Sequence, residues 1–180
     1  MIFGLFISYI CPQLTFNQIV IPQADTVKYL GLHLDRRLTW NCHITKLWKH
    51  LDLKTKDLYW IIGRHSPLSL NNKLLIYKAI LKPIWTYGLE LWGCASPSNI
   101  AKFQRYQSKI LRLITNAPWF VTNQILHQDL CIDNVKSEFR KKAAAHHRTL
   151  TEHSNPLMRP LTVQPKHRRL MRNWTFDGIN

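Results

Sequence analysis

The residues with the clearest chemical pattern are basic side chains that recur along one predicted helix. Their spacing of three, four and three positions would place them in a single stripe on a helix surface. Cations in such a row can follow the phosphates of a nucleic-acid backbone. The alternative is an ordinary solvated helix face. The stripe consists of Lys102, Arg105, Lys109 and Arg112.

A second set of cations falls on an earlier predicted helix, on a face away from the apolar residues Ile44, Leu47 and Leu51. One stripe alone favours a solvated face, but two stripes with few compensating acids favour binding of a polyanion. Several Trp and Tyr side chains could also stack on bases, although most are expected in the core. The second set consists of Lys46, Lys49 and Lys56.

The overall composition agrees with a polyanionic partner. The chain has 180 residues, with 25 Lys and Arg against 10 Asp and Glu, and a formal net charge of +15. Such an excess repels itself unless a polyanion offsets it. Nucleic acid is the commonest such partner, an anionic membrane surface is the alternative, and a solvated basic surface remains possible. Hydrophobic residues make up 46%, which is enough for a core.

Residues that could perform catalysis or hold a metal are not grouped in the sequence. Two-metal chemistry needs carboxylates that converge on one point, but Asp35 stands alone, and Asp129 and Asp133 fit a helix cap and a surface charge. The four cysteines are far apart, and the nine histidines show no zinc spacing. We therefore expect no catalytic residue, no metal ligand and no cofactor in this chain, and reduced cysteines in an intracellular protein.

The N-terminal part has the alternation and turn residues of β-strands. Its first eleven residues are apolar but too short to span a bilayer, and we interpret them as a buried strand. Residues 14–21 predict two short strands around an Asn17-Gln18 turn. Residues 26–34 predict a third strand, in which Gly31 marks a bulge or a close approach of another backbone. No segment of the chain is long and apolar enough for a membrane helix, so no membrane partner is expected.

After Arg37 the apolar residues follow a helical period. Gly63 should end the first helix, Ser69 should begin the second, Pro83 should kink or end it, and Ser98 should cap the third. Residues 84–93 are ambiguous. The helices are expected over roughly residues 38–62, 69–83, 98–116, 123–130 and 134–150.

These elements predict an α+β fold that is mostly α, with a small antiparallel β-sheet, then a helical bundle, then a basic C-terminal tail. A sheet of two or three strands would be marginal alone, which suggests that the chain is a piece of something larger. The expected divisions are residues 1–37, 38–117, 118–154 and 155–180.

Four segments carry a resemblance to a known family. They closely resemble, in this order, the C-terminal third of jockey-like non-LTR retrotransposon reverse transcriptases. The resemblance covers roughly residues 12–175, and it is the succession of segments that makes it specific. The segments are VKYLGLHLDRRLTW, IIGRHSPLSLNNKLLIYKAILKPIWTYGLELWGCAS, SNIAKFQRYQSKILRLITNAPWFV and LHQDLCI.

The resemblance implies roles for the basic and glycine-containing segments. Residues 1–37 resemble the last palm strands, where Tyr29, Leu30 and Gly31 correspond to a primer grip whose backbone approaches the primer's terminal phosphates. Arg36 and Arg37 would then lie near those phosphates. Residues 38–117 resemble the thumb, which packs against the template–primer duplex. An RNA/DNA template–primer is therefore the implied partner.

The chain also departs from the family. The family's polymerase centre is a Tyr/Phe-x-Asp-Asp turn plus an upstream Asp that together hold Mg²⁺, and neither occurs here. The fingers, most of the palm and the endonuclease are missing as well. The resemblance thus implies a truncated RNA-directed DNA polymerase that is inactive alone. An active polymerase and a non-functional or protein-interaction helical remnant are the alternatives. Nucleus and cytoplasm are not distinguished, because KHRRLMR is only a weak basic patch.

Overall fold

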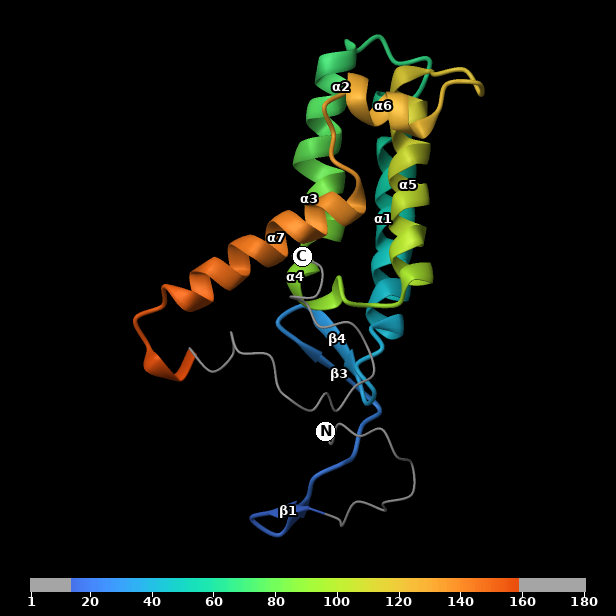
Figure 1. Cartoon of the computed structure of the whole chain (residues 1–180). Helices are drawn as coiled ribbons and strands as arrows, with labels where there is room; N and C mark the ends of the chain where they lie inside the picture. Colours follow the sequence, from blue (N-terminus) through green and yellow to red (C-terminus); the bar gives the residue numbers. More distant parts are fainter. Residues whose placement is uncertain (1–13, 159–180) are drawn as a thin grey trace.

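Helices dominate the architecture, and the strands form two short hairpins near the N-terminus (Figure 1). The structure is a computed structural model that describes residues 14–158. It confirms the predicted α+β, mostly α, fold class, but the strands form two separate two-stranded sheets instead of one. The strand predicted over residues 1–11, and the predicted tail beyond residue 158, lie outside the described residues.

The first hairpin agrees with the sequence prediction. Strand β1 (Thr15–Phe16) pairs antiparallel with β2 (Ile19–Val20). The turn residues Asn17 and Gln18 both have positive φ, at 48° and 62°. A two-residue turn of this handedness matches the twist of the flanking strands. All four strand residues are exposed, and the hairpin lies apart from the helices in Figure 1.

The prediction of one strand over residues 26–34 is wrong. The segment is a hairpin in which β3 (Thr26–Tyr29) pairs antiparallel with β4 (Leu32–Asp35). Leu30 and Gly31 form the turn, with φ of 44° and 77°. A Cβ at Gly31 would lie 3.2 Å from the Tyr87 ring. A single strand was predicted because a two-residue turn leaves the alternation of side chains unbroken across both strands.

The helices occur where the sequence predicts them, and a π-turn within the second predicted helix is an additional feature. Helix α1 ends before Gly63 and α7 is capped by Asn134, as predicted. Helix α5 is preceded by Ser96 instead of the predicted Ser98, because Pro97 is favourable at a first helical position. The elements are α1 (Asn41–Ile62), α2 (Leu70–Ile76), the π-turn η1 (Tyr77–Leu81), α3 (Lys82–Thr86), α4 (Leu89–Trp92), α5 (Pro97–Thr115), α6 (Asn123–Asp129) and α7 (Val135–Thr151).

Pro83 does not end the second helix, because a π-turn precedes it. Ser69 caps α2 as predicted, and α2, η1 and α3 form one continuous helical segment. The Lys82 N–H donates to the Tyr77 carbonyl, five residues back. The wider turn accommodates the proline ring, which would otherwise clash with the preceding turn. The ambiguous residues 84–93 therefore contain the end of α3 and all of α4.

The core lies between α1, the α2–α3 segment, α4 and α5. Helices α1 and α5 lie side by side in Figure 1. Trp48 of α1 packs edge-on against Phe103 and Tyr106 of α5, and the Tyr106 and Thr55 hydroxyls are 2.6 Å apart. The largest fully buried side chains include Trp85, Trp92, Tyr77 and Phe103. Burial of these side chains, together with Ile44, Leu51 and Ile62 of α1, therefore fixes which faces of α1 and α5 point outward.

Two buried or half-buried lysines tie the helices together. The Lys73 ammonium of α2 is buried and donates to the Gly63 carbonyl at 2.8 Å, which satisfies the C-terminal end of α1. Lys82 of α3 forms a 2.5 Å ion pair with the buried Glu138 of α7. At Gly93, which follows α4, a Cβ would lie 2.2 Å from a ring carbon of Phe139. Helix α7 is thus fixed closely against α3 and α4.

His43 occupies an unusual place in this core. Its side chain is only 4% exposed and meets the rings of Trp40 and Trp92 edge-on. Neither ring nitrogen has a hydrogen-bond partner among the described residues. Burial, and secondarily the nearby His33, lowers the pKa of His43 to about 4.

His43 should therefore make folding sensitive to acid. Because its folded pKa lies below the ordinary value of 6.5, the unfolded chain binds a proton first as the pH falls. The free energy of unfolding should decrease between about pH 6.5 and pH 4, by roughly 3 kcal/mol in all. Urea denaturation at several pH values in this window should show that His43→Phe removes this component. The exposed His50→Phe should keep it, and a wild-type pH dependence in His43→Phe would contradict the assignment.

Candidate nucleic-acid interface

A hollow at the junction of the β3–β4 hairpin and α1 brings together four of the predicted cations. It has a volume of about 570 Å³ and also includes Asp25 and Asp35 in its lining. Among the described residues, neither carboxylate forms an ion pair with these cations. Such a concentration of positive charge suits an anionic ligand. The four cations are Arg36, Arg37, Lys46 and Lys49.

Asp35 shapes this hollow by holding the chain between the hairpin and α1. Its carboxylate accepts hydrogen bonds from the Arg37 N–H at 3.1 Å, the Thr39 N–H at 2.8 Å and the Thr39 hydroxyl at 2.8 Å. The same segment contains two left-handed residues, Leu38 and Trp40. Asp35 therefore has a structural role in this turn.

The cations of the hollow differ in whether their side chains contact another polar group. The Lys46 ammonium lies 3.2 Å from Nδ1 of His33. Desolvation of the imidazole, and then the charges of Lys46 and Lys28, lower the pKa of His33. His33 is therefore a neutral acceptor for Lys46 near neutral pH. Arg36, Arg37 and Lys49 are exposed, and their side chains have no polar partner within residues 14–158.

Lys56 lies further along α1 and is partly neutralised. It forms a 2.7 Å ion pair with Asp52, and both side chains are exposed. An exposed pair of this kind contributes little to stability, but it lowers the local positive charge. The α1 stripe is consequently strongest at its N-terminal end, beside the hollow.

The α5 stripe has no acidic neighbours along the chain. Between Glu90 and Asp129 the sequence contains no Asp or Glu. Lys102 donates to Asn99 at 2.9 Å, and Arg105 donates to the Ala101 carbonyl of its own helix at 3.2 Å. Lys109 is exposed and has no polar partner within residues 14–158. Lys102 and Lys109 are separated by about 10 Å of helix rise, so these cations could contact successive phosphates.

Arg112, the fourth predicted cation of this stripe, is engaged inside the fold. Its guanidinium donates four hydrogen bonds to the loop between α5 and α6 and to the first residue of α6. Two go to Asn123 Oδ1 at 3.1 and 3.0 Å, one goes to the Pro118 carbonyl at 3.1 Å, and one goes to the Val121 carbonyl. Arg112 therefore fixes the loop over residues 116–122, which the sequence pattern did not indicate.

The segment Tyr29-Leu30-Gly31, which contains the hairpin turn, lies at the opposite end of the β3–β4 hairpin from Arg36 and Arg37. Four-residue strands separate the two ends by about 13 Å. The Tyr87 hydroxyl donates to the Leu30 carbonyl at 2.7 Å, so one backbone acceptor of this turn is already used. The Leu30-Gly31 turn and the Arg36-Arg37 pair are therefore about one strand length apart.

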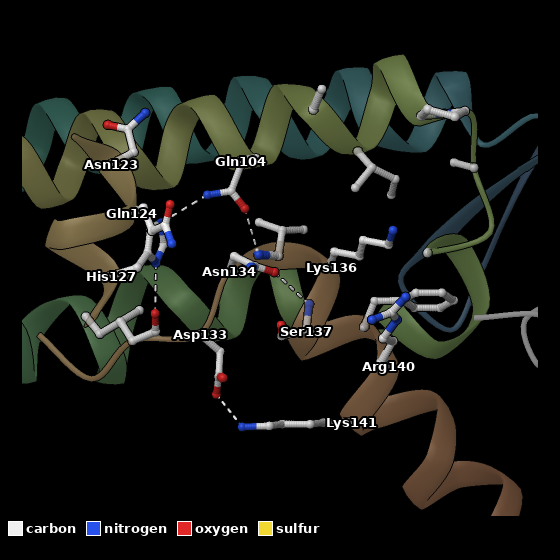
Figure 2. A pocket seen from close by; sticks show the side chains of 18 of the residues that line it. Gln104, Asn123, Gln124, His127, Asp133, Asn134, Lys136, Ser137, Arg140 and Lys141 are labelled. Atoms are coloured by element: carbon white, nitrogen blue, oxygen red, sulfur yellow. Dashed lines mark hydrogen bonds and ion pairs between the residues drawn. The ribbon is translucent and has the colours of Figure 1, made fainter. Parts of the chain in front are cut away.

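A larger hollow of about 1350 Å³ lies between α5, α6 and the first turns of α7 (Figure 2). Sequence reasoning missed it. Gln104 of α5 spans its wall, because its Oε1 accepts from the Val135 N–H at 2.9 Å and its Nε2 lies 3.0 Å from Nε2 of His127. Asp133 pairs with Lys141 at 2.5 Å, and this hydrogen bond raises the pKa of Lys141.

One sequence signal for the contact between α5 and the α6–α7 connection was available. Gln107 lies between Phe103 and the apolar Ile110 and Leu111 on the buried face of α5. A glutamine there must find a partner, and its Nε2 donates to the Asp133 carbonyl at 2.8 Å. The α6–α7 connection is therefore attached to α5 through glutamine side chains.

Two further findings concern classes of site that the sequence analysis considered. Within residues 14–158, no group of three or more His, Cys, Asp or Glu side chains is placed to hold a metal ion. In the same part of the chain, no helix has the length and apolar character needed to cross a membrane.

Comparison with known proteins shows extensive similarity to polymerases of mobile elements. The chain is 42% identical over 168 residues to the probable RNA-directed DNA polymerase from transposon X-element of Drosophila melanogaster. It is 34% and 35% identical to the RNA-directed DNA polymerases from mobile element jockey of Drosophila funebris and Drosophila melanogaster. These alignments cover 93%, 85% and 84% of this chain.

The chain is homologous to a segment of the jockey-like RNA-directed DNA polymerases. It spans only 18%, 17% and 16% of the length of these three relatives, which is consistent with the C-terminal part that the sequence resemblance indicated. No family model matches the chain, and no solved structure matches it. The family resemblance drawn from the sequence is thus confirmed, whereas the primer-grip and thumb roles stay predictions for this jockey-like segment.

The loop-holding role of Arg112 can be tested by mutation. Replacing Arg112 with Gln removes charge-assisted hydrogen bonds to two carbonyls, so we expect the free energy of unfolding to fall by about 1–3 kcal/mol. Limited proteolysis should also cut residues 116–122 faster. Arg105→Gln is the matched control, because Arg105 contacts only its own helix. Equal stability and equal cleavage of the two variants would contradict this role.

Proposed function

We propose that the chain binds an RNA/DNA template–primer through backbone phosphates and has no polymerase active site of its own. The observation that carries the proposal is the acid-free α5 stripe of Lys102, Arg105 and Lys109, together with the cation-rich hollow at the start of α1. Phosphate contacts of this kind position a duplex without reading its sequence. The similarity to RNA-directed DNA polymerases supports nucleic acid as the polyanion.

In this proposal the β3–β4 hairpin acts as the primer-grip region and the α1–α5 bundle acts as the thumb. The parts that make bonds, including the carboxylates that hold Mg²⁺, belong to other regions of the longer relatives. The hairpin and the bundle are joined by the Asp35-held turn, so the hollow lies between the two contact regions. A duplex lying across both would meet cations from the turn, from α1 and from α5.

The salt dependence of binding tests the α5 stripe. We expect Lys102→Gln/Arg105→Gln/Lys109→Gln to weaken binding of an RNA–DNA hybrid and to reduce the slope of log K against log salt by about 2–3, because about three phosphate contacts are lost. Arg112 is left unchanged in this variant, since its removal would disturb a loop as well. Filter binding at several salt concentrations provides the measurement.

The control variant removes the same charge elsewhere. Lys54→Gln/Lys78→Gln/Arg148→Gln changes exposed cations on α1, η1 and α7, and it should alter the slope much less. Equal effects of the two triple variants would show that net charge alone matters and would contradict a defined interface. Absence of binding at low salt would favour the helical-remnant or protein-interaction alternative.

The second part of the proposal concerns catalysis. Because the sequence lacks an Asp-Asp pair, the purified chain should extend no primer when Mg²⁺ and deoxynucleotides are supplied. A primer-extension assay measures this, with a complete reverse transcriptase as the positive control. Extension that disappears in Asp129→Asn/Asp133→Asn would overturn this part and leave the binding proposal to its own test.

A further inference from the structure

The loop between α5 and α6 presents two adjacent aromatic rings to solvent. Trp119 is 90% exposed and Phe120 is 68% exposed. Their ring centroids are 6.1 Å apart, with the planes 80° from parallel. Trp119 is the most exposed large hydrophobic side chain within residues 14–158. Aromatic side chains of this size usually contribute to a core or to an interface.

The loop that carries these rings is ordered by specific contacts. Arg112 donates to the carbonyls of Pro118 and Val121, which flank the two aromatic residues. The Val121 N–H donates to the Pro118 carbonyl at 3.2 Å, closing a turn around the rings. Thr122 then caps α6 by accepting from the Ile125 N–H. The rings are therefore held outward by the fold, which lowers the entropy lost when they meet a partner.

The charged residues near the α5–α6 loop indicate what kind of partner the two rings would bind. The loop directly continues α5 (Figure 1), and the stripe residue Lys109 lies less than two turns before the end of that helix. The loop lies within the acid-free part of the sequence between Glu90 and Asp129. A partner that suits both features carries negative charge along its length and flat apolar groups beside that charge. Single-stranded nucleic acid has this combination, because phosphates and bases alternate along it.

We propose that Trp119 and Phe120 form a stacking platform for unpaired bases of a strand whose phosphates lie along α5. This inference rests on the proposed nucleic-acid binding and adds a preference to it. A duplex with a single-stranded extension should bind better than a blunt duplex, because stacked bases inside a duplex are not accessible to the rings. The platform accepts any base, since every base has a flat face.

The test compares a blunt RNA–DNA hybrid with the same hybrid carrying a single-stranded extension that contains 2-aminopurine. Trp119→Leu/Phe120→Leu keeps apolar side chains but removes the stacking surface. We expect this variant to lose about tenfold in affinity for the extended probe and to lose the quenching of 2-aminopurine fluorescence. Its affinity for the blunt hybrid and its salt slope should stay unchanged. Phe16→Leu is the control, because Phe16 is 69% exposed and lies in the separate β1–β2 hairpin.

The outcomes separate this inference from the function on which it rests. If the Leu variant binds both probes like the wild type, the platform is overturned while phosphate binding stands. If the variant instead loses self-association or binding to anionic vesicles and keeps its affinity for the extended probe, the rings belong to a protein or membrane surface, and the platform is again overturned. If the wild-type chain binds neither probe at low salt, both proposals fail.

Discussion

The packing of α1 against α5 is the interaction on which the rest of the molecule depends. Trp48 lies against Phe103 and Tyr106, and the Tyr106 hydroxyl shares a short hydrogen bond with Thr55. Burial raises the pKa of Tyr106 to about 12, so this hydroxyl keeps its proton at physiological pH. With the apolar faces of both helices turned inward, most of their lysines and arginines face solvent, and Arg112 is an exception because it binds the following loop. The packing of the core therefore also determines where the positive charge lies on the surface.

Three faces of helix α5 have three different structural roles. Its apolar face completes the core, Gln104 and Gln107 hold the α6–α7 connection, and its cations face solvent. At its C-terminal end Arg112 turns back to fix the following loop. A helix with all of its faces in use tolerates little change in its rotation, because a small rotation would disturb the core and the polar contacts together.

Much of this arrangement could be predicted from the sequence, and the failures have physical reasons. The 3.6-residue period located α1 and α5, since burial of one face imposes that period on the apolar residues, and the Asn134 cap located α7. The β3–β4 turn was missed because Leu30-Gly31 interrupts the pairing without interrupting the alternation. The role of Arg112 was hidden because a guanidinium in a basic stripe can donate to phosphates or to nearby carbonyls equally well. Spacing alone does not decide between them, whereas the position of the following loop does.

The π-turn before Pro83 has a consequence for how this segment can vary in length. A π-turn holds one residue more than the corresponding turn of α-helix, so the wider turn absorbs that residue and the helix faces before and after it stay aligned. Tyr77 and Leu81 within the turn and Trp85 after it are all fully buried. A deletion of one residue here would leave an ordinary α-turn, so the indole would keep its direction but the Pro83 ring would clash with the preceding turn. The extra residue and the proline should therefore be gained or lost together.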